Sequence, residues 1–247
     1  MRLEFSLTTL IAALVLPLSF ALAEPVRFVI VDFPPYALHD DPEGRLGLMA
    51  DIDIAIAERA GLSVTDKVLP MARAIKNLER GLSDCAVIAL TPWSEEKFLP
   101  VAKILNRFDA IIVTREGLPI TRVEDLHGKR LAIPRGSFSD SPISSDPNIE
   151  QVLTNGYEQS VRLLKAGRVE AIAGSELSIF YFFSFEEMRR EDIGGILPLI
   201  HASLWLHCAK EQLPDEVLIQ LQQATDTLRL EGVFDNLVKR YIPADFS

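Results

Sequence analysis

Residues 73–98 read RAIKNLERGLSDCAVIALTPWSEEKF, and this stretch decides the expected fold. Its first half belongs to an amphipathic helix, because Met71, Ile75 and Leu78 recur at spacings of four and three residues. Gly81 then stands where a helix commonly ends in a left-handed glycine. The stretch therefore begins with a helix that has one buried face and a defined end.

A buried strand is expected directly after this helix, at the apolar run of residues 85–90. Two further strands are expected before it, at residues 26–31 and 64–69, with a helical pattern between them at residues 48–60. This alternation of strands and helices predicts an α/β fold with a parallel sheet. Ligands of such folds bind beyond the carboxyl ends of the strands, so a site is expected near residues 91–94.

The rest of the chain carries a second set of alternating elements. Strands are expected at residues 110–114, 129–133, 169–173, 196–200 and 204–209. Helices are expected from residue 121 and at residues 156–166, 176–185, 215–230 and 233–240, with a loop at residues 139–148. The two sets predict two lobes, between which the chain passes near residues 110–114 and again near residues 199–206.

The N-terminal residues 1–23 resemble a secretory signal peptide. Arg2 supplies a basic start, residues 7–22 are mostly apolar, and residues 21–23 read ALA, which fits a cleavage site. The alternative is an N-terminal membrane anchor. We expect cleavage after residue 23 and a mature protein in the periplasm.

Charge and cysteine content narrow the function classes. The formal net charge of −10 argues against a nucleic-acid partner, which would need a basic face, and against adhesion to anionic lipid. The two cysteines, Cys85 and Cys208, can pair in an oxidising compartment or remain buried thiols, and the sequence leaves both alternatives open.

Several short motifs occur in an order that resembles one known family, the periplasmic solute-binding proteins of family 3, which serve amino-acid-type ABC transporters. The motifs are Phe33-Pro34-Pro35-Tyr36, Gly47 with Asp51-Ile52-Asp53, Pro70-x-x-Arg73-Ala74, Gly81-x-x-Asp84, Thr91-Pro92, Glu124-Asp125-Leu126-x-Gly128-Lys129, Gly136-Ser137, Gly167-Arg168-Val169-Glu170-Ala171 and the segment from Gly232 to Tyr241. They cover nearly all of the expected mature chain.

The resemblance implies the type II periplasmic-binding-protein fold, in which two α/β lobes joined by two crossing strands close on a solute. Lobe 1 would comprise residues 24–114 and 203–247, and lobe 2 residues 115–202. The implied function is capture of a small polar solute and its delivery to an ABC importer. The alternative is a ligand-sensing module for a membrane sensor kinase or cyclase, and an enzyme on the same fold, such as a dehydratase, comes third. No metal or cofactor is implied, and a monomer is expected.

The candidate ligand-binding residues follow the expected strands. They are Phe33, Tyr36, Arg73, Thr91, Trp93, Ser94, Arg135, Ser137, Phe138, Ser175 and Glu176. The resemblance places Phe33 and Tyr36 as aromatic walls, where they can stack on a solute or simply pack within their lobe. It places Thr91 and Ser137 where hydroxyl or amide groups bind the solute, although either residue can equally serve a turn or helix cap.

Two departures from the family pattern concern the groups that hold an α-amino acid. The family carries an arginine shortly after its Thr-Pro pair, whereas residues 93–96 here read WSEE. The family's ammonium-binding aspartate aligns with Ser175, and Glu176 is adjacent. Arg73, Arg115 and Arg135 are the cations that could substitute for the missing arginine. We therefore expect a solute other than a standard amino acid, and Trp93 favours a flat or partly apolar one.

Catalytic motifs are weak in this sequence. Residues 94–97 match S-x-x-K, but the companion motifs of acyl-serine hydrolases are missing, and Ser94 is better explained as a cap of a short helix. The four histidines show no metal-ligand spacing. We therefore expect a binding protein rather than an enzyme.

Overall fold

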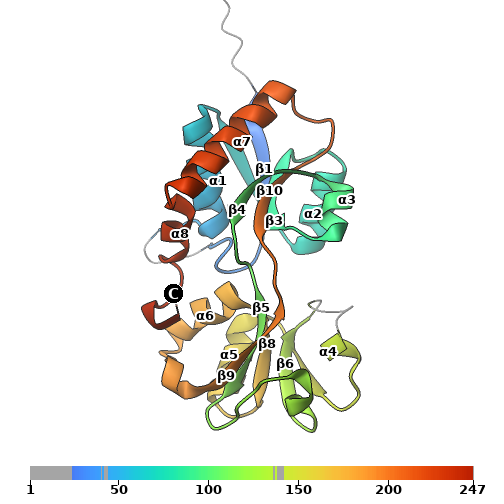
Figure 1. Ribbon diagram of the computed structural model, residues 1–247, viewed down its shortest axis with the longest axis vertical. Coiled ribbons are helices and arrows are strands. Elements are labelled where there is room, and N and C mark those ends of the chain that lie inside the picture. The colour runs from blue at the N-terminus through green and yellow to red at the C-terminus, as the bar shows by residue number, and fades with distance from the viewer. Residues whose placement is uncertain (1–23, 40, 42–43, 136, 138–141, 247) are drawn as a thin grey trace, which may run out of the picture.

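The computed structural model describes residues 24–39, 41, 44–135, 137 and 142–246, so the expected signal segment and Phe138 lie outside the described residues. The chain forms two α/β lobes stacked along the long axis of the molecule (Figure 1). None of the helices in the described ranges has the length and apolar character needed to cross a bilayer. The fold is the expected two-lobed type II arrangement.

The sheet of lobe 1 has the strand order β2-β1-β3-β10-β4. Its strands are β1 (Val26–Val31), β2 (Val64–Leu69), β3 (Cys85–Ala89), β4 (Leu99–Leu105) and β10 (Leu204–Cys208). The strands β1, β2 and β3 run parallel, whereas β10 is antiparallel to both of its neighbours. The antiparallel strand arises because the chain enters β10 from the other lobe.

Helices cover both faces of this sheet, and alternate residues of β1 face different core clusters. Phe28 and Ile30 pack with α1 (Leu48–Ala60), α7 (Asp215–Leu230) and α8 (Val233–Val238). Val29 and Val31 pack on the opposite side with α2 (Met71–Glu79) and with Phe98, which follows α3 (Pro92–Lys97). Burial on both faces explains why residues 28–31 of β1 are all apolar.

The sheet of lobe 2 has the order β7-β6-β8-β5-β9. Its strands are β5 (Ala110–Arg115), β6 (Arg130–Pro134), β7 (Glu150–Thr154), β8 (Ala171–Ser175) and β9 (Ile193–Ile200). The accompanying helices are η1 (Val123–Leu126), α4 (Pro142–Ser145), α5 (Tyr157–Lys165), α6 (Glu176–Phe185) and η2 (Arg190–Asp192). The strands β6, β7 and β8 run parallel, and β5 is antiparallel to β8 and β9.

The expected boundary at residue 114 is wrong. Strand β5 pairs with β8 and β9, so it belongs to lobe 2, and the chain crosses between the lobes at residues 106–109. The edge strand β4, for which the sequence pattern gave no prediction, completes lobe 1 instead. Its sequence LPVAKIL contains a proline and a lysine, which conceal the strand pattern. The return crossing lies at residues 201–203.

The two lobes share one structural motif. Arg27 opens β1, and its backbone N–H and guanidinium donate to Asp84 while the guanidinium also donates to the Gly81 carbonyl. Arg130 opens β6 and makes the same set of bonds to Glu170 and the Gly167 carbonyl. These contacts give the Gly-x-x-acid motifs a structural role at the amino ends of β1 and β6.

A disulfide joins Cys85 to Cys208. The two residues are register partners on the neighbouring strands β3 and β10, and both are fully buried. Of the two alternatives for the cysteines, a disulfide or two buried thiols, the structure contains the disulfide.

Candidate ligand site between the two lobes

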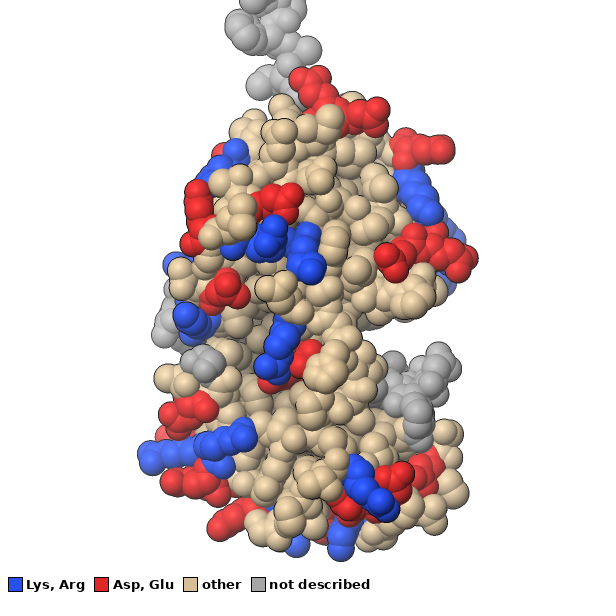
Figure 2. All heavy atoms as spheres, in the orientation of Figure 1, with Lys and Arg blue, Asp and Glu red and all other residues tan. Residues whose placement is uncertain are grey.

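The carboxyl ends of the parallel strands in the two lobes face each other. The loop after β1 meets the carboxyl end of β8, where the hydroxyls of Tyr36 and Ser175 form a hydrogen bond. Phe33, also after β1, lies edge-on to Tyr157, which follows β7, with 4.9 Å between ring centroids. Figure 2 shows a deep notch between the lobes, on the side where Figure 1 places α2, α3 and α4. This notch is the candidate site, because open α/β sheets bind ligands at such edges.

Backbone packing fixes the aromatic loop after β1. The first N–H groups of α1 donate back to this loop, Leu48 to the Pro35 carbonyl at 2.8 Å and Met49 to the Tyr36 carbonyl at 3.1 Å. Gly47 has φ of 115°, and a Cβ there would lie 2.5 Å from the Tyr36 carbonyl oxygen. Only glycine permits this approach, so Gly47 holds the loop against α1.

Four hydroxyl-bearing residues connect the loops around the notch. The Tyr36 hydroxyl bonds to Ser175, and the backbone N–H of Ser175 donates to the Tyr157 hydroxyl at 2.9 Å. The Tyr157 hydroxyl also hydrogen-bonds to the side chain of Ser137. Burial raises the pKa of Tyr36, and it raises the pKa of Tyr157 to about 12. Both phenols are therefore neutral near pH 7 and can donate or accept hydrogen bonds.

The helix α3 uses the polar residues at its start as a cap. Thr91 is the N-cap and accepts from the Ser94 N–H at 3.1 Å, while the Ser94 hydroxyl accepts from the Thr91 N–H at 2.9 Å. Ser94 is buried, and its hydroxyl also contacts the Ala89 carbonyl. Ser94 was expected to be the cap of this helix. The N-cap is instead Thr91, and Ser94 is the other member of the capping box. Because Ser94 is buried and its O–H faces backbone carbonyls, its side chain is not presented to a solute.

Three candidate residues lie exposed at the sheet edges. The Trp93 side chain in α3 is 45% exposed and contacts Phe98 edge-on. Arg73 lies in the first turn of α2, after β2, and Arg135 follows β6. No carboxylate in the described ranges pairs with either arginine. Both guanidinium groups are therefore available to a solute.

Glu176 is engaged elsewhere. Its carboxylate oxygens accept from Arg107 at 3.2 and 3.3 Å, and Arg107 also donates to Asp109 at 3.1 Å. His201, in the return crossing, lies 3.2 Å from the same Asp109 oxygen. Burial raises the pKa of Glu176, while Arg107 acts in the opposite direction. Arg107, Asp109 and His201 lie on the crossing segments, and the ion pair with Arg107 ties Glu176, at the start of α6, to this hinge.

The chain matches the family model of bacterial extracellular solute-binding proteins, family 3, over residues 27–244. It belongs to this family. A relative in Bacillus subtilis (strain 168), described as probable amino-acid-binding protein YxeM, is 22% identical over 219 residues, covering 86% of this chain and 81% of the relative. These findings confirm the resemblance that the sequence motifs indicated.

Solved structures support the same fold. The substrate-binding protein of an amino acid ABC transporter has a TM-score of 0.63 and 23% identity, covering 88% of this chain and 98% of that one. A histidine kinase sensor domain with similarity to periplasmic binding proteins has a TM-score of 0.65 and 18% identity, covering 88% of this chain and 95% of that one. The TM-scores show that this family 3 protein shares the fold of these structures. Identities this low give no information about its solute.

Two residues with contacts at the notch and the hinge of this family member, Tyr157 and Arg107, were not among the candidates predicted from the sequence. Tyr157 follows β7, whose sequence EQVLT is too polar and short to predict a strand. Without that strand, Tyr157 had no predicted place at a carboxyl edge. Arg107 follows β4, which was also missed, so its position in the hinge was not visible.

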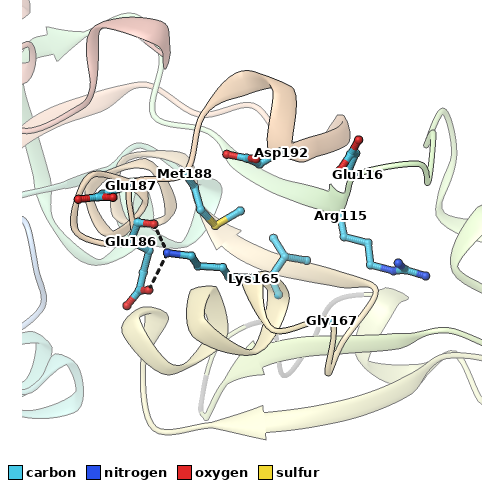
Figure 3. A pocket seen from close by; sticks show the side chains of 9 residues that line it. Arg115, Glu116, Lys165, Gly167, Glu186, Glu187, Met188 and Asp192 are labelled. Carbon is cyan, nitrogen blue, oxygen red and sulfur yellow. Dashed lines mark hydrogen bonds and ion pairs between the residues drawn. The ribbon is translucent and has the colours of Figure 1, made fainter.

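A second depression of about 480 Å³ lies within lobe 2, away from the interlobe contacts of this solute-binding protein (Figure 3). Arg115, one of the cations considered as a substitute, lines it together with Lys165, Glu116 and Asp192. Lys165 pairs there with Glu186. The depression thus places Arg115 away from the notch.

Within the described part of the chain, no group of His, Cys, Asp and Glu side chains could hold a metal ion.

Proposed function

We propose that this family 3 protein is a periplasmic receptor that captures a small polar solute in the interlobe notch and delivers it to an ABC importer. One observation carries the proposal: the loop after β1 of lobe 1 meets the carboxyl end of β8 of lobe 2 at the hydrogen bond between Tyr36 and Ser175. A solute in the notch would contact both lobes only when they are closed, so binding would stabilise the closed state. An importer could recognise that state.

The proposed binding residues are candidates that lie at the strand ends, facing the notch. They are Phe33, Tyr36, Arg73, Thr91, Trp93, Arg135, Ser137 and Ser175. Phe33 and Trp93 would provide aromatic surface, and the two arginines would attract an anionic group of the solute. We leave out Ser94 and Glu176, because the helix cap and the hinge ion pair occupy them.

Location outside the cytoplasmic membrane is supported by the disulfide. The pair Cys85–Cys208 joins two strands of one sheet, and such bonds persist in oxidising compartments. The family description as extracellular agrees with this proposal.

The second candidate is a sensory role, in which the closed protein contacts a membrane sensor instead of an importer. It is supported by the likeness in fold to the kinase sensor domain, whereas the likeness to the transporter protein supports import. Permease and ATPase genes beside this one would favour import. A neighbouring sensor gene without them would favour signalling.

A thermal-shift screen of residues 24–247 tests solute capture. Amino acids, organic acids, polyamines, sugars and aromatic metabolites would be added separately, and a solute at 100 times its Kd should raise stability by about 2.7 kcal/mol. The Kd of a positive solute would then be measured by calorimetry with wild type and Trp93→Ala.

The matched control is Phe185→Ala, which removes another exposed aromatic ring distant from the strand ends. We expect weaker binding in Trp93→Ala and unchanged binding in the control. A screen without any stabilising solute would contradict solute capture. Equal affinity in all three proteins would remove Trp93 from the site.

A further inference from the structure

The C-terminal residues are anchored in lobe 1 by Tyr241. This side chain is 2% exposed, and its hydroxyl donates to an Asp51 carboxylate oxygen in α1 at 2.7 Å. The Arg45 guanidinium lies over the Tyr241 ring, 5.3 Å from its centroid. Arg240 lies 3.6 Å from the same Asp51 oxygen. Packing, a hydrogen bond and an ion pair thus fix the chain to lobe 1 at this residue.

Five residues later the chain is anchored in lobe 2. The Phe246 ring stacks on Phe180 of α6, with centroids 4.4 Å apart and an interplanar angle of 20°. It also meets Phe183 of the same helix at 5.4 Å. Ile242, between the anchors, packs against the cores of both lobes. The C-terminus therefore passes from one lobe to the other.

We propose that residues 241–246 form a C-terminal strap, a third connection that limits how far the two lobes swing apart. The two crossing segments, residues 106–109 and 201–203, run side by side and would alone permit rotation about themselves (Figure 1). The strap lies on the side of these segments away from the notch, against α6 (Figure 1). A link displaced from the hinge segments restricts that rotation.

The strap has little slack in its observed form. Five residue steps separate the anchors, which bounds their Cα separation at roughly 17 Å in a fully extended chain. Residues 244–246 are instead wound into the short helix η3 (Ala244–Phe246). Wide opening on this side must therefore unwind η3 or pull Phe246 from α6.

Contacts of α6 act on the same side as the strap. Leu177 and Tyr181 pack within the core cluster of lobe 1, although α6 follows a strand of lobe 2. The Ser178 hydroxyl donates to the Pro34 carbonyl at 2.9 Å. The strap thus helps to hold α6 against lobe 1, which α6 already contacts. Removal of the strap leaves α6 with fewer contacts to lobe 1.

Interlobe distances in the solute-free protein test this proposal. Spin labels at Glu96→Cys in α3 and Asn155→Cys after β7 report across the two lobes, since both residues are exposed. We expect Phe246→Ala, and a truncation after Ile242, to broaden the distance distribution and shift it to longer values. Tyr241→Phe, which loses only the bond to Asp51, should shift it in the same direction by less.

The control is Phe185→Ala, because Phe185 is an exposed residue of α6 whose ring contacts, among the described residues, are with Tyr181 and Phe182 and not with a ring of the strap. Its distribution should match that of wild type. Distributions identical to wild type in Phe246→Ala, Tyr241→Phe and the truncation, each with native circular dichroism, would overturn the proposal. Since Tyr241→Phe removes one oxygen atom only, it keeps the test decisive if the larger changes unfold the protein. The measurement needs no solute, so its failure is distinct from a failure of the proposed function.

Discussion

The hydroxyl of Tyr36 bonds to the hydroxyl of Ser175, which lies 139 residues further along the chain and in the other lobe. Tyr36 lies in the loop that follows β1 in lobe 1, and Ser175 is the last residue of β8 in lobe 2. Tyr36 is 8% exposed, so this bond is shielded from water. The bond therefore joins the two lobes directly beside the notch.

The Tyr36–Ser175 bond should contribute measurably to stability. We expect Tyr36→Phe to lower the free energy of unfolding by about 0.5–1.5 kcal/mol, the usual net value of one hydrogen bond. Ser175→Ala should have a similar cost, and the double variant should cost less than the two together, because both single changes remove the same bond. Urea unfolding of the four proteins measures this coupling. Strictly additive costs would mean that the two hydroxyls do not interact.

Gly174 should be required for the position of Tyr157. A Cβ at Gly174 would lie 1.9 Å from a ring carbon of Tyr157, so Gly174→Ala must displace this ring. We expect a loss of about 1–3 kcal/mol of stability, as for other overpacked cores, and a changed near-UV circular dichroism spectrum. Solute affinity should also fall, since Tyr157 bonds to both Ser175 and Ser137.

The matched control for this change is Gly156→Ala. Gly156 directly precedes Tyr157 and has extended φ, and apart from its chain neighbours no heavy atom of the described residues lies within 4 Å of a Cβ built there. It should therefore leave the spectrum unchanged. Equal effects of the two substitutions would show that steric contact with Tyr157 is not the cause.

Asp53 should make the protein less stable as pH rises. It is fully buried in α1, and neither carboxylate oxygen has a hydrogen-bond partner among the described residues. Burial raises its pKa well above the ordinary value of 3.8, with Asp66 acting in the same direction. Between the pKa of Asp53 in the unfolded state and its raised pKa in the folded state, the folded protein binds more protons than the unfolded protein. The stability of the folded protein therefore falls as pH rises through this range. Asp53→Asn should gain stability relative to wild type as pH rises through the same window.

Glu170 provides a control of opposite sign. The Arg130 side chain and backbone lower the pKa of Glu170 from 4.5 to about 2. Its stabilising effect is present above the unfolded pKa and is lost as pH falls toward 2. Glu170→Gln should therefore be less stable than wild type at neutral pH and should approach it in acid. Urea midpoints from pH 3 to 8 measure both variants, and parallel curves for wild type and Asp53→Asn would contradict the role of Asp53.

The sequence predicts the elements better than it predicts their contacts. The apolar strands β1, β3 and β8 were visible because both of their faces are buried. Strands β4 and β7 were not, because their sequences LPVAKIL and EQVLT carry polar residues, among them Lys103 and Glu150, that interrupt the apolar pattern. Missing β4 also moved the expected lobe boundary to the far end of β5.

The candidate site was predictable as a set of strand ends and not as a network. Phe33, Tyr36 and Ser175 follow expected strands, so position alone identified them. Their pairing depends on how two separately folded sheets approach each other, which no local pattern encodes. The engagement of Glu176 by Arg107 is of the same kind, since 69 residues separate them. Availability of a side chain to a solute is therefore a property of the tertiary structure.

The Cys85–Cys208 disulfide should be a large contribution to stability that reductant can remove only through the unfolded protein. The bond closes a loop with a sequence separation of 123, for which the loss of chain entropy in the unfolded state corresponds to about 4–5 kcal/mol. Both cysteines are fully buried, so native protein should resist reductant without denaturant. We expect the urea midpoint to fall when reductant is present during unfolding. The Cys85→Ser/Cys208→Ser variant should unfold at a low midpoint that reductant does not change. An equal midpoint for wild type with and without reductant, at equilibrium, would show that the bond does not form or does not stabilise the sheet.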